Sequence, residues 1–374
     1  MNIFRLEEFL SKHEFSAKYL LCCSDAESFE MSEILEMAGS EERDLWNNLR
    51  LSYTEAKGLP ALRESVAEQL YPGLNMENIL MFAGAEEGIF CALYALIQEG
   101  DHVIVLSPCY QSLFEIPKSR GADISEIKLR EENNWRIDAG AIEDAIKANT
   151  KAIVINFPHN PTGQVIEEEE LIDLVSICKA KDIWLFSDEV YRLLGNPQKP
   201  WASPAACVYE KALSLGVMSK AFGMAGLRIG WIACQDKKML KKIEQIKHYS
   251  SICNSAPAEI LSLISLKSKN IILERNNQIV ADNLKLLDEF FIEYCDYFEW
   301  VRPQGGCVGF VKYKGAESID SLCERLVNKQ NVLLMPSSVY NYESNYFRIG
   351  FGRKNMPQCL EQFKEFLRNE NIQP

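Results

Sequence analysis

The sequence predicts an α/β protein with a largely parallel sheet, followed by a smaller α+β domain. Between about residues 79 and 234, short apolar runs alternate with longer amphipathic segments. Strands that are buried on both faces of a parallel sheet have this near-continuous apolar character. After residue 237 the pattern changes to helical stretches mixed with short strands, which indicates the second domain.

The expected elements follow from these runs and from the turn residues that end them. We place strands at 79–82, 102–106, 151–156, 183–186, 212–215 and 229–232, and helices at 86–98 and 167–180. The acidic run 167–170 suits the first turn of its helix, because carboxylates are favourable at the positive end of the helix dipole. The C-terminal part predicts helices at 237–249, 257–294 and 318–328 and from 357, and strands at 298–302, 309–311, 332–335 and 346–350.

Length and composition limit the classes of function. The 374 residues are enough for about two domains, and 47% apolar with 25% charged residues is ordinary globular usage. A net charge of −13 argues against nucleic acid or an anionic membrane as the main partner. No apolar stretch approaches the roughly 20 residues that cross a bilayer, and the N-terminus lacks a signal-peptide pattern. We therefore expect a cytoplasmic protein.

Cysteine and histidine spacing gives no support to a metal site. Of the twelve cysteines only Cys22 and Cys23 are close together, and adjacent cysteines do not form the C-x-x-C clips of zinc or redox sites. The four histidines never pair at ligand spacing. Reduced, mostly buried thiols in a cytosolic protein are the expected state.

Polar residues follow three of the expected strands, where a parallel sheet binds its ligands. The strand ending at Asn156 leads into a rigid turn around Asn160, although turn chemistry alone equally suits a structural role. The next strand ends at Asp188, a carboxylate that is costly to bury without a cation or strong donors. A third leads to Lys220, whose apolar neighbours should lower its pKa, as an amine nucleophile requires.

The order of these motifs resembles the class I/II aminotransferases, fold-type I enzymes that depend on pyridoxal 5'-phosphate (PLP), from Tyr53 to Arg348. The resemblance implies a large PLP-binding domain at 40–275 with a mostly parallel seven-stranded sheet, and a small domain made of 1–39 and 276–374. The motifs that carry it are Asn160-Pro-Thr-Gly, Asp188-x-x-Tyr191, Ser219-Lys220 and Gly226-x-Arg228-x-Gly230.

The resemblance implies three catalytic residues, Lys220, Asp188 and Tyr191. Lys220 would form the internal aldimine and then move the proton. Asp188 would pair with the protonated pyridine nitrogen and keep the ring an electron sink. Asn160 and Tyr191 would hydrogen-bond the phenolic oxygen of the ring.

The same resemblance implies a phosphate site. Arg228 would hold the phosphate, together with backbone N–H groups at the helix start after Gly84, namely those of Ala85 and Glu86. Ser219, next to the lysine, would contribute to cofactor binding.

Aromatic and basic residues complete the implied site. Tyr110 resembles the aromatic residue that stacks on the cofactor ring, with a place in the core as the alternative. Tyr53 resembles the tyrosine that reaches the neighbouring subunit's site, which would make the enzyme a homodimer with shared active sites. Arg348 resembles the arginine that grips the substrate α-carboxylate, with Asn160 beside it. Arg353 matches no family position and is expected at the surface.

Three features depart from the family pattern. Val217 stands where many relatives have a phosphate-binding hydroxyl, three positions before the lysine. Glu86 places a carboxylate at the phosphate site. In place of the usual Gly-rich substrate loop the chain has 22–28, with acidic residues that could favour a cationic substrate. This segment could lie over the active site, or it could simply precede a capped helix near Met31.

The expected activity is transfer of an amino group between an L-amino acid and a 2-oxo acid through the Lys220 aldimine. Other PLP chemistry on an amino acid, by an oxidase or hydroxylase, a cyclase or a β-lyase, is the alternative, because the departures are similar to those of capreomycidine-synthase-like and arginine-oxidase-like enzymes. A catalytically silent PLP-binding module is a more remote possibility, since Lys220 is retained and no DNA-binding segment is appended.

Overall fold

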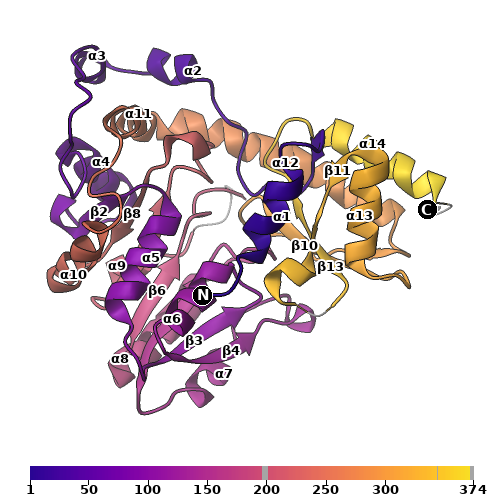
Figure 1. Cartoon of the computed structure of the whole chain (residues 1–374), viewed down its shortest axis with the longest axis horizontal. Helices are drawn as coiled ribbons and strands as arrows, with labels where there is room; N and C mark the ends of the chain where they lie inside the picture. Colours follow the sequence, from indigo (N-terminus) through magenta and orange to yellow (C-terminus); the bar gives the residue numbers. More distant parts are fainter. Residues whose placement is uncertain (196–200, 343, 371–374) are drawn as a thin grey trace.

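A seven-stranded sheet forms the centre of the larger part of the molecule (Figure 1). The computed structural model describes residues 1–195, 201–342 and 344–370. The strand order is β2-β8-β7-β6-β5-β3-β4, and all neighbouring pairs are parallel except those made by β8. The strands are β2 (Ile79–Phe82), β3 (His102–Ser107), β4 (Asp123–Lys128), β5 (Thr150–Asn156), β6 (Trp184–Asp188), β7 (Ala212–Val217) and β8 (Gly230–Ala233).

Helices cover both faces of this sheet. The larger helices and the short ones between them are α1 (Arg5–His13), α2 (Met31–Glu36), α3 (Ser40–Asn47), α4 (Pro60–Leu70), α5 (Ala85–Leu96), α6 (Gln111–Ser119), α7 (Ala139–Asp144), α8 (Glu168–Lys181), α9 (Ala205–Val208), α10 (Lys237–Lys247), α11 (Ala256–Lys267), α12 (Lys269–Glu293), α13 (Ile319–Gln330) and α14 (Met356–Asn369).

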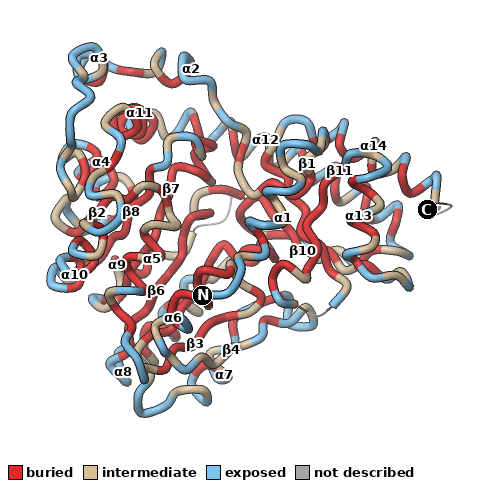
Figure 2. Tube along the Cα trace, viewed as in Figure 1, coloured by how far each residue is buried: buried red, intermediate tan, exposed pale blue. Residues whose placement is uncertain are grey.

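Successive side chains of each strand point to opposite faces of the sheet, so the core around the sheet has two layers. Val105 and Phe186 pack in a cluster with residues of α5 and α10, whereas Ile104 and Leu185 pack in another with residues of α8. Side chains of a strand point to opposite faces in turn, so each strand must be apolar at nearly every position. The burial of the central strands in Figure 2 agrees with this arrangement. The apolar runs are therefore the direct consequence of a sheet covered on both sides.

The C-terminal part builds a second, antiparallel sheet of four strands in the order β12-β13-β10-β9. The long helix α12 runs between the two parts of the molecule, and α13 and α14 pack beside the second sheet (Figure 1). A short parallel pair, β1 with β11, ties the N-terminal segment to this part. The strands are β1 (Tyr19–Leu20), β9 (Phe298–Glu299), β10 (Val308–Tyr313), β11 (Val332–Leu333), β12 (Met335–Pro336) and β13 (Tyr346–Gly350).

The predicted fold class is confirmed, with several corrections to its elements. The expected single helix 257–294 is two helices, because Ser268 leaves the helical conformation (φ −103°, ψ 17°) between α11 and α12. Strand β4 was missed because it lies at the sheet edge and has no fully buried residue. Helices α1, α3, α4, α6, α7 and α9 and strand β1 were also missed, and the expected strand 332–335 is two strands, β11 and β12. The domain limits, 40–275 for the large domain and 1–39 with 276–374 for the small one, stay a prediction. The seven-stranded sheet lies within 40–275, the four-stranded sheet lies within 276–374, and the pair β1–β11 joins the two segments of the small domain.

Two further features of the structure concern disulfide bonds and membrane-spanning helices. All twelve cysteines are free. Within the described part of the chain, no helix combines the length and the apolar character that crossing a membrane requires.

Candidate active site

The carboxyl ends of β5, β6 and β7 lie side by side and form the base of the candidate site. Asn156, the last residue of β5, is in register with Asp188, the last residue of β6, and Asp188 is in register with Leu215 of β7. The Asn156 amide donates a hydrogen bond to the Asp188 backbone oxygen (3.0 Å) and fixes the two strand ends together. Polar groups that are distant in the sequence therefore meet at this edge, as expected for a parallel sheet.

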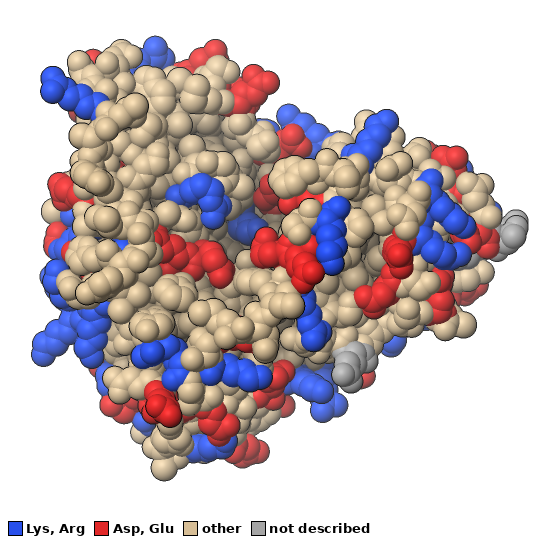
Figure 3. All heavy atoms as spheres, in the orientation of Figure 1, with Lys and Arg blue, Asp and Glu red and all other residues tan. Residues whose placement is uncertain are grey.

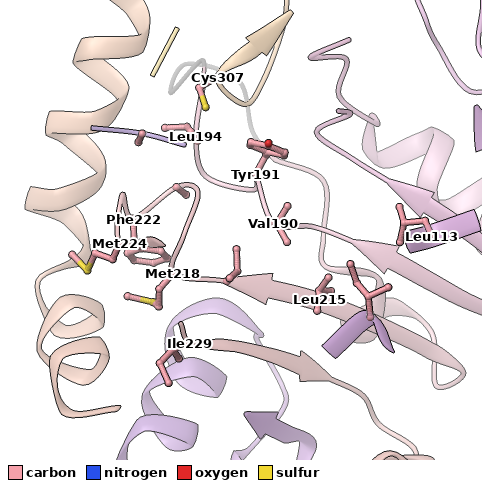
Figure 4. Close-up of a cluster of buried hydrophobic side chains, with 14 of the residues drawn as sticks. Leu113, Val190, Tyr191, Leu194, Leu215, Met218, Phe222, Met224, Ile229 and Cys307 are labelled. Atoms are coloured by element: carbon pink, nitrogen blue, oxygen red, sulfur yellow. The ribbon is translucent and has the colours of Figure 1, made fainter. Parts of the chain in front are cut away.

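A packed apolar layer supports the segment that leads to Lys220 (Figure 4). Leu215, Met218 and Ile229 are buried there, and the Met218 N–H donates to the Ile229 carbonyl oxygen (3.0 Å). Close packing of this kind leaves little freedom for the backbone. Lys220 is thus presented from a rigid support.

A cavity of about 420 Å³ lies above these strand ends, a size typical of small-molecule sites. In Figure 3 the middle of the visible face is hollowed, with acidic side chains on both sides of the hollow. Gly84 adjoins the cavity through Ala85, whereas Tyr53 lies outside it and is 88% exposed. The predicted site residues that line the cavity are Ala85, Glu86, Tyr110, Asn160, Asp188, Tyr191, Ser219, Lys220, Arg228 and Arg348.

Lys220 presents its amine to this cavity. Its Nζ donates a hydrogen bond to the Ser24 hydroxyl (2.8 Å) and lies 5.6 Å from the centre of the Tyr191 ring. Burial lowers the pKa of Lys220, because a charged ammonium loses its hydration there. A larger fraction of neutral amine, the form that attacks a carbonyl carbon, follows from this shift.

Asp188 is a buried carboxylate that lacks a cation. It is 4% exposed, its Oδ1 accepts a hydrogen bond from the Val190 N–H (3.2 Å), and it forms no ion pair with a described residue. Burial raises the pKa of Asp188 to about 7. A positively charged ligand group in the cavity would restore the ionised form, so this carboxylate suits a protonated ring nitrogen.

Tyr191 and Asn160 offer hydrogen-bond donors to the same cavity. The Tyr191 hydroxyl is buried and has no hydrogen-bond partner among the described residues. The Asn160 side-chain oxygen accepts from the Tyr340 hydroxyl (3.1 Å), and this contact orients the amide. An unpaired buried hydroxyl is costly unless a ligand satisfies it, so the site fits a ring that carries an oxygen acceptor.

Arg348 is a buried cation held by neutral groups. Its guanidinium donates to the Tyr340 hydroxyl (2.6 Å), the Cys22 carbonyl oxygen (2.6 Å) and the Asn160 side-chain oxygen (3.3 Å), while Nε has no partner among the described residues. It is only 2% exposed, and no described carboxylate pairs with it. A buried guanidinium without a counter-ion is a binding site for a carboxylate.

An anion cradle lies at the start of α5. Gly84 has a positive φ (92°), and a Cβ there would come within 2.6 Å of the Arg228 guanidinium. A Cβ on Gly230 would similarly press on the backbone of Gly84 and on the N atom of Ala85. These glycines bring Arg228 against free N–H groups at a helix N-terminus, which favours a phosphate.

Glu86 lies next to this cradle. One carboxyl oxygen accepts a hydrogen bond from the Ser112 hydroxyl, and the other is buried without a partner among the described residues. Burial is the largest influence on Glu86 and raises its pKa. The carboxyl therefore takes up a proton more readily than an exposed glutamate, and the protonated form is compatible with a nearby phosphate.

The N-terminal helix α1 reaches the cavity beside Tyr110. The Tyr110 hydroxyl donates to a carboxyl oxygen of Glu7 (3.3 Å), and its ring packs on Phe4, with ring centres 5.4 Å apart. Tyr110 is thus both a cavity residue and part of a small aromatic contact with the start of the chain. Its role as the stacking aromatic stays a prediction.

Residues 22–25 of the segment 22–28 line the cavity, and the segment also precedes a capped helix, so the structure agrees with both interpretations of this segment. Ser24 contacts Lys220 as described, and α2 begins after Glu30 with a capping box. Arg353, expected at the surface, is partly buried. Its guanidinium donates to both carboxyl oxygens of Asp25 (3.0 and 3.1 Å), and Asp25 lines the cavity.

Three functional candidates escaped the sequence analysis. Glu7 comes from α1, Glu14 from the C-terminal cap of α1, and Tyr340 from a short helical turn before β13. No strand-end pattern marks these positions, and only tertiary structure brings the two glutamates to the cavity and Tyr340 to Arg348. In the part of the chain that the structure describes, no group of His, Cys, Asp and Glu could hold a metal ion.

Comparison with protein families gives one match that spans most of the chain. The sequence model of aminotransferase class I and II matches residues 19–362. Capreomycidine synthase from Streptomyces vinaceus is 28% identical over 352 residues, which are 92% of this chain and 88% of the synthase. Aspartate aminotransferase from Thermotoga maritima is 26% identical over 329 residues, 85% of this chain and 84% of the relative.

Solved structures repeat the same fold. A PLP-dependent aminotransferase from Streptococcus suis superposes with a TM-score of 0.92 at 32% identity, and the match covers 98% of both chains. The PLP-dependent cyclase OrfR gives a TM-score of 0.90 at 22% identity and covers 99% of this chain and 98% of that one, which shows a common fold.

Proposed function

The chain belongs to the class I and II aminotransferase family, whose fold-type I enzymes use PLP, and we propose that it transfers an amino group between an L-amino acid and a 2-oxo acid. One observation carries the proposal. Lys220 and Asp188, an amine with a lowered pKa and a carboxyl with a raised one, line the same cavity as Arg348, a buried guanidinium that has no counter-ion among the described residues.

Each group has a task that its surroundings support. Bound PLP supplies a ring that accepts electrons and stabilises negative charge at the substrate Cα. Asp188 keeps the ring nitrogen protonated, and Tyr191 and Asn160 donate to the ring oxygen. Lys220 holds the cofactor and moves the proton at Cα, and Arg348 fixes the α-carboxylate.

The remaining cofactor contacts come from the cradle and from Tyr110. The N–H groups of Ala85 and Glu86 and the Arg228 guanidinium hold the phosphate. Ser219 follows β7 in the cavity wall and can add its hydroxyl, since Val217 offers none. Tyr110 covers the ring.

The half-reaction with amino acids tests the proposal. Holoenzyme is mixed with single L-amino acids in the absence of any 2-oxo acid, and the cofactor's visible absorption and the products are followed. We expect at least one amino acid to convert the cofactor to its pyridoxamine form with one equivalent of 2-oxo acid. Ammonia release or oxygen uptake without pyridoxamine formation would contradict transamination.

The similarity to capreomycidine synthase over 92% of this chain favours a second candidate, other PLP chemistry on an amino acid. The same cavity residues would serve such a reaction up to removal of the α-proton. The two reactions would differ in what then happens to the negative charge left at the substrate Cα. The products of the half-reaction therefore distinguish the two candidates.

Glu86 should make cofactor retention depend on pH. A phosphate beside Glu86 raises the pKa of this carboxyl further. PLP therefore binds most tightly at a pH below the pKa that Glu86 has in the cofactor-free protein, and binding weakens as the pH rises through that pKa. The pKa of Glu86 lies above its ordinary value of 4.5. We therefore expect that, between pH 5 and 8.5, the PLP dissociation constant of the wild type increases more than that of Glu86→Gln, by a factor of up to about ten.

The measurement is equilibrium titration of cofactor-free protein with PLP at fixed ionic strength. The comparison with Glu86→Gln removes the titration of the phosphate itself, which both proteins share. Parallel pH profiles for the two proteins would show that Glu86 does not face the phosphate.

We also propose a homodimer in which Tyr53 enters the active site of the partner subunit. Tyr53 and Leu51 are each 88% exposed, which is unusual for large apolar side chains that are close together in one segment. Exchange of this segment between two copies would bury both residues and is consistent with closed two-fold symmetry.

A hybrid dimer tests this arrangement. Tyr53→Ala and Lys220→Ala homodimers should each lose activity, about tenfold or more for Tyr53→Ala. Co-expressed chains should regain about a quarter of wild-type activity, because one site of each hybrid is intact. Activity no higher than that of the separate variants would contradict a shared site, and so would a monomer in solution.

We expect the protein to work in the cytoplasm. Its twelve free cysteines support this location, since oxidising compartments favour disulfides.

A further inference from the structure

More charged side chains line the cavity than are needed to bind the cofactor and the substrate α-carboxylate. In the proposed function Asp188 pairs with the ring, Arg228 with the phosphate and Arg348 with the α-carboxylate, while Lys220 performs the chemistry. The carboxyl groups that remain in the lining belong to Glu7, Glu14, Asp25 and Glu86.

Two of these four carboxyl groups, those of Asp25 and Glu86, already have their charge compensated within the protein. Asp25 forms an ion pair with Arg353 (3.0 Å). Glu86 accepts a hydrogen bond from Ser112, and burial favours its neutral form. Glu7 and Glu14 form no ion pair with a described residue, and Glu7 has only the hydrogen bond from Tyr110. Burial raises the pKa of Glu14, and the nearby cations Arg353, which is paired with Asp25, and Lys220 offset this rise only in part.

Glu7 of α1 and Glu14, the residue that caps the C-terminal end of α1 in helical conformation, lie on one face with aliphatic residues between them. Leu6 and Leu10 line the cavity together with the two glutamates, and spacings of three, four and seven residues place side chains on the same side of a helix. This cavity-facing surface of α1, made of Leu6, Glu7, Leu10 and Glu14, thus combines an apolar strip with two carboxylates.

The helix is fixed over the cavity by its N-terminal end. The Arg5 N–H donates to the Gln111 side-chain oxygen (2.9 Å), the Gln111 amide donates to the Ile3 carbonyl oxygen (2.8 Å), and the Asn2 amide donates to Glu115 (2.8 Å). All three contacts connect the start of the chain to α6 and so hold α1 in place. The two glutamates therefore belong to the wall of the site rather than to a free terminus.

Independent features show that this cavity is built for a ligand. The Tyr191 hydroxyl and the Arg348 Nε are buried polar atoms without partners among the described residues, and both side chains line the cavity. Arg348 is suited to one end of an amino acid. Glu7 and Glu14 line the same cavity as Lys220, so the α1 segment forms part of the wall around the reacting centre.

From these observations we propose that the substrate is an L-amino acid whose side chain ends in a cation, an ammonium or a guanidinium group, that Glu7 and Glu14 bind. The aliphatic part of that side chain packs on Leu6 and Leu10. This inference rests on the proposed function, because it assumes that the α-amino group reacts at Lys220.

The charge balance also argues against a dicarboxylic substrate, although relatives include aspartate aminotransferases. A second substrate carboxylate needs a cation of its own. The described residues that line the cavity provide Lys220, Arg228 and Arg348, and each has another task. Glu7 and Glu14 would repel an acidic side chain.

Binding of analogues that cannot react tests the inference. α-Methylornithine, α-methylnorvaline and α-methylglutamate lack the α-proton and differ in the charge of the side chain. Their dissociation constants are measured from the change in the visible absorption of the holoenzyme. We expect α-methylornithine to bind at least about tenfold more tightly than α-methylnorvaline, and α-methylglutamate most weakly.

Variants of α1 assign the effect to the two glutamates. Glu14→Gln and Glu7→Gln should reduce the preference for α-methylornithine over α-methylnorvaline, and the double variant should abolish it. Glu8→Gln is the matched control, because Glu8 lies on the same helix, pairs with Lys12 and does not line the cavity. Glu14→Lys should turn the preference toward α-methylglutamate.

The outcomes separate the two proposals. Equal binding of all three analogues, or an unchanged preference in the double variant, overturns the cationic substrate and leaves the PLP reaction intact. If no analogue changes the absorption of the wild type, and α-amino acids do not either, the proposed function falls and the inference falls with it.

Discussion

Replacement of Lys220 by alanine is expected to abolish the lysine-bound form of the cofactor and to lower the rate of amino transfer by about 10⁴-fold or more. The variant loses both the amine that holds PLP and the group that moves the proton at Cα. The visible absorption of the holoenzyme and the rate of the half-reaction are the two measurements.

Chemical rescue separates this role from a loss of folding. Lys220 lies in the wall of a cavity, so a small amine such as methylamine has room to take its place in Lys220→Ala. Added methylamine should restore part of the activity of this variant and should not affect the wild type. A variant that keeps the wild-type absorption and more than about a tenth of the activity would contradict the assignment.

Replacement of Asp188 by asparagine should have opposite effects on activity and on stability. Amino transfer should fall by about 10³-fold, because a neutral amide no longer keeps the ring nitrogen protonated. In the cofactor-free protein, burial raises the Asp188 pKa to about 7, above its value in the unfolded chain. A raised carboxyl pKa gives stability at low pH that is lost as pH rises through 7.

Thermal unfolding of cofactor-free protein tests the stability part of this prediction. Asp188→Asn should melt a few degrees above the wild type at pH 8.5, where the wild-type carboxylate is charged and buried, and close to the wild type at pH 5. With PLP bound the advantage should disappear, because the ring cation stabilises the Asp188 charge. An equal difference at both pH values would show that Asp188 does not titrate in this range.

The central sheet could be predicted from the sequence because burial on both faces leaves a simple signal. Strands β5 and β6 contain unbroken apolar runs, at 152–155 and 184–186. Strand β4 lacks that signal because one side of it faces solvent at the sheet edge. The break at Ser268 has no Pro or Gly to mark it, so two helices were predicted as one.

The candidate site was predictable where it depends on the strand ends. Asp188 and Lys220 follow apolar strands, and the parallel order of those strands brings them to one edge. Ser24 and Tyr340 have no comparable local pattern. Ser24 reaches the cavity only through the packing of the N-terminal segment, and Tyr340 reaches Arg348 only through the packing beside the second sheet. The place of Tyr53 in a partner's site stays a prediction.

The position of the cofactor on the chain is the central claim, and borohydride reduction tests it most directly. Reduction of the holoenzyme fixes PLP to the amine that holds it, and peptide mass spectrometry then locates the modified residue. We predict one PLP adduct per chain, on Lys220, and no adduct in Lys220→Ala. An adduct on another lysine, or a holoenzyme preparation that carries none after reduction, would contradict the account.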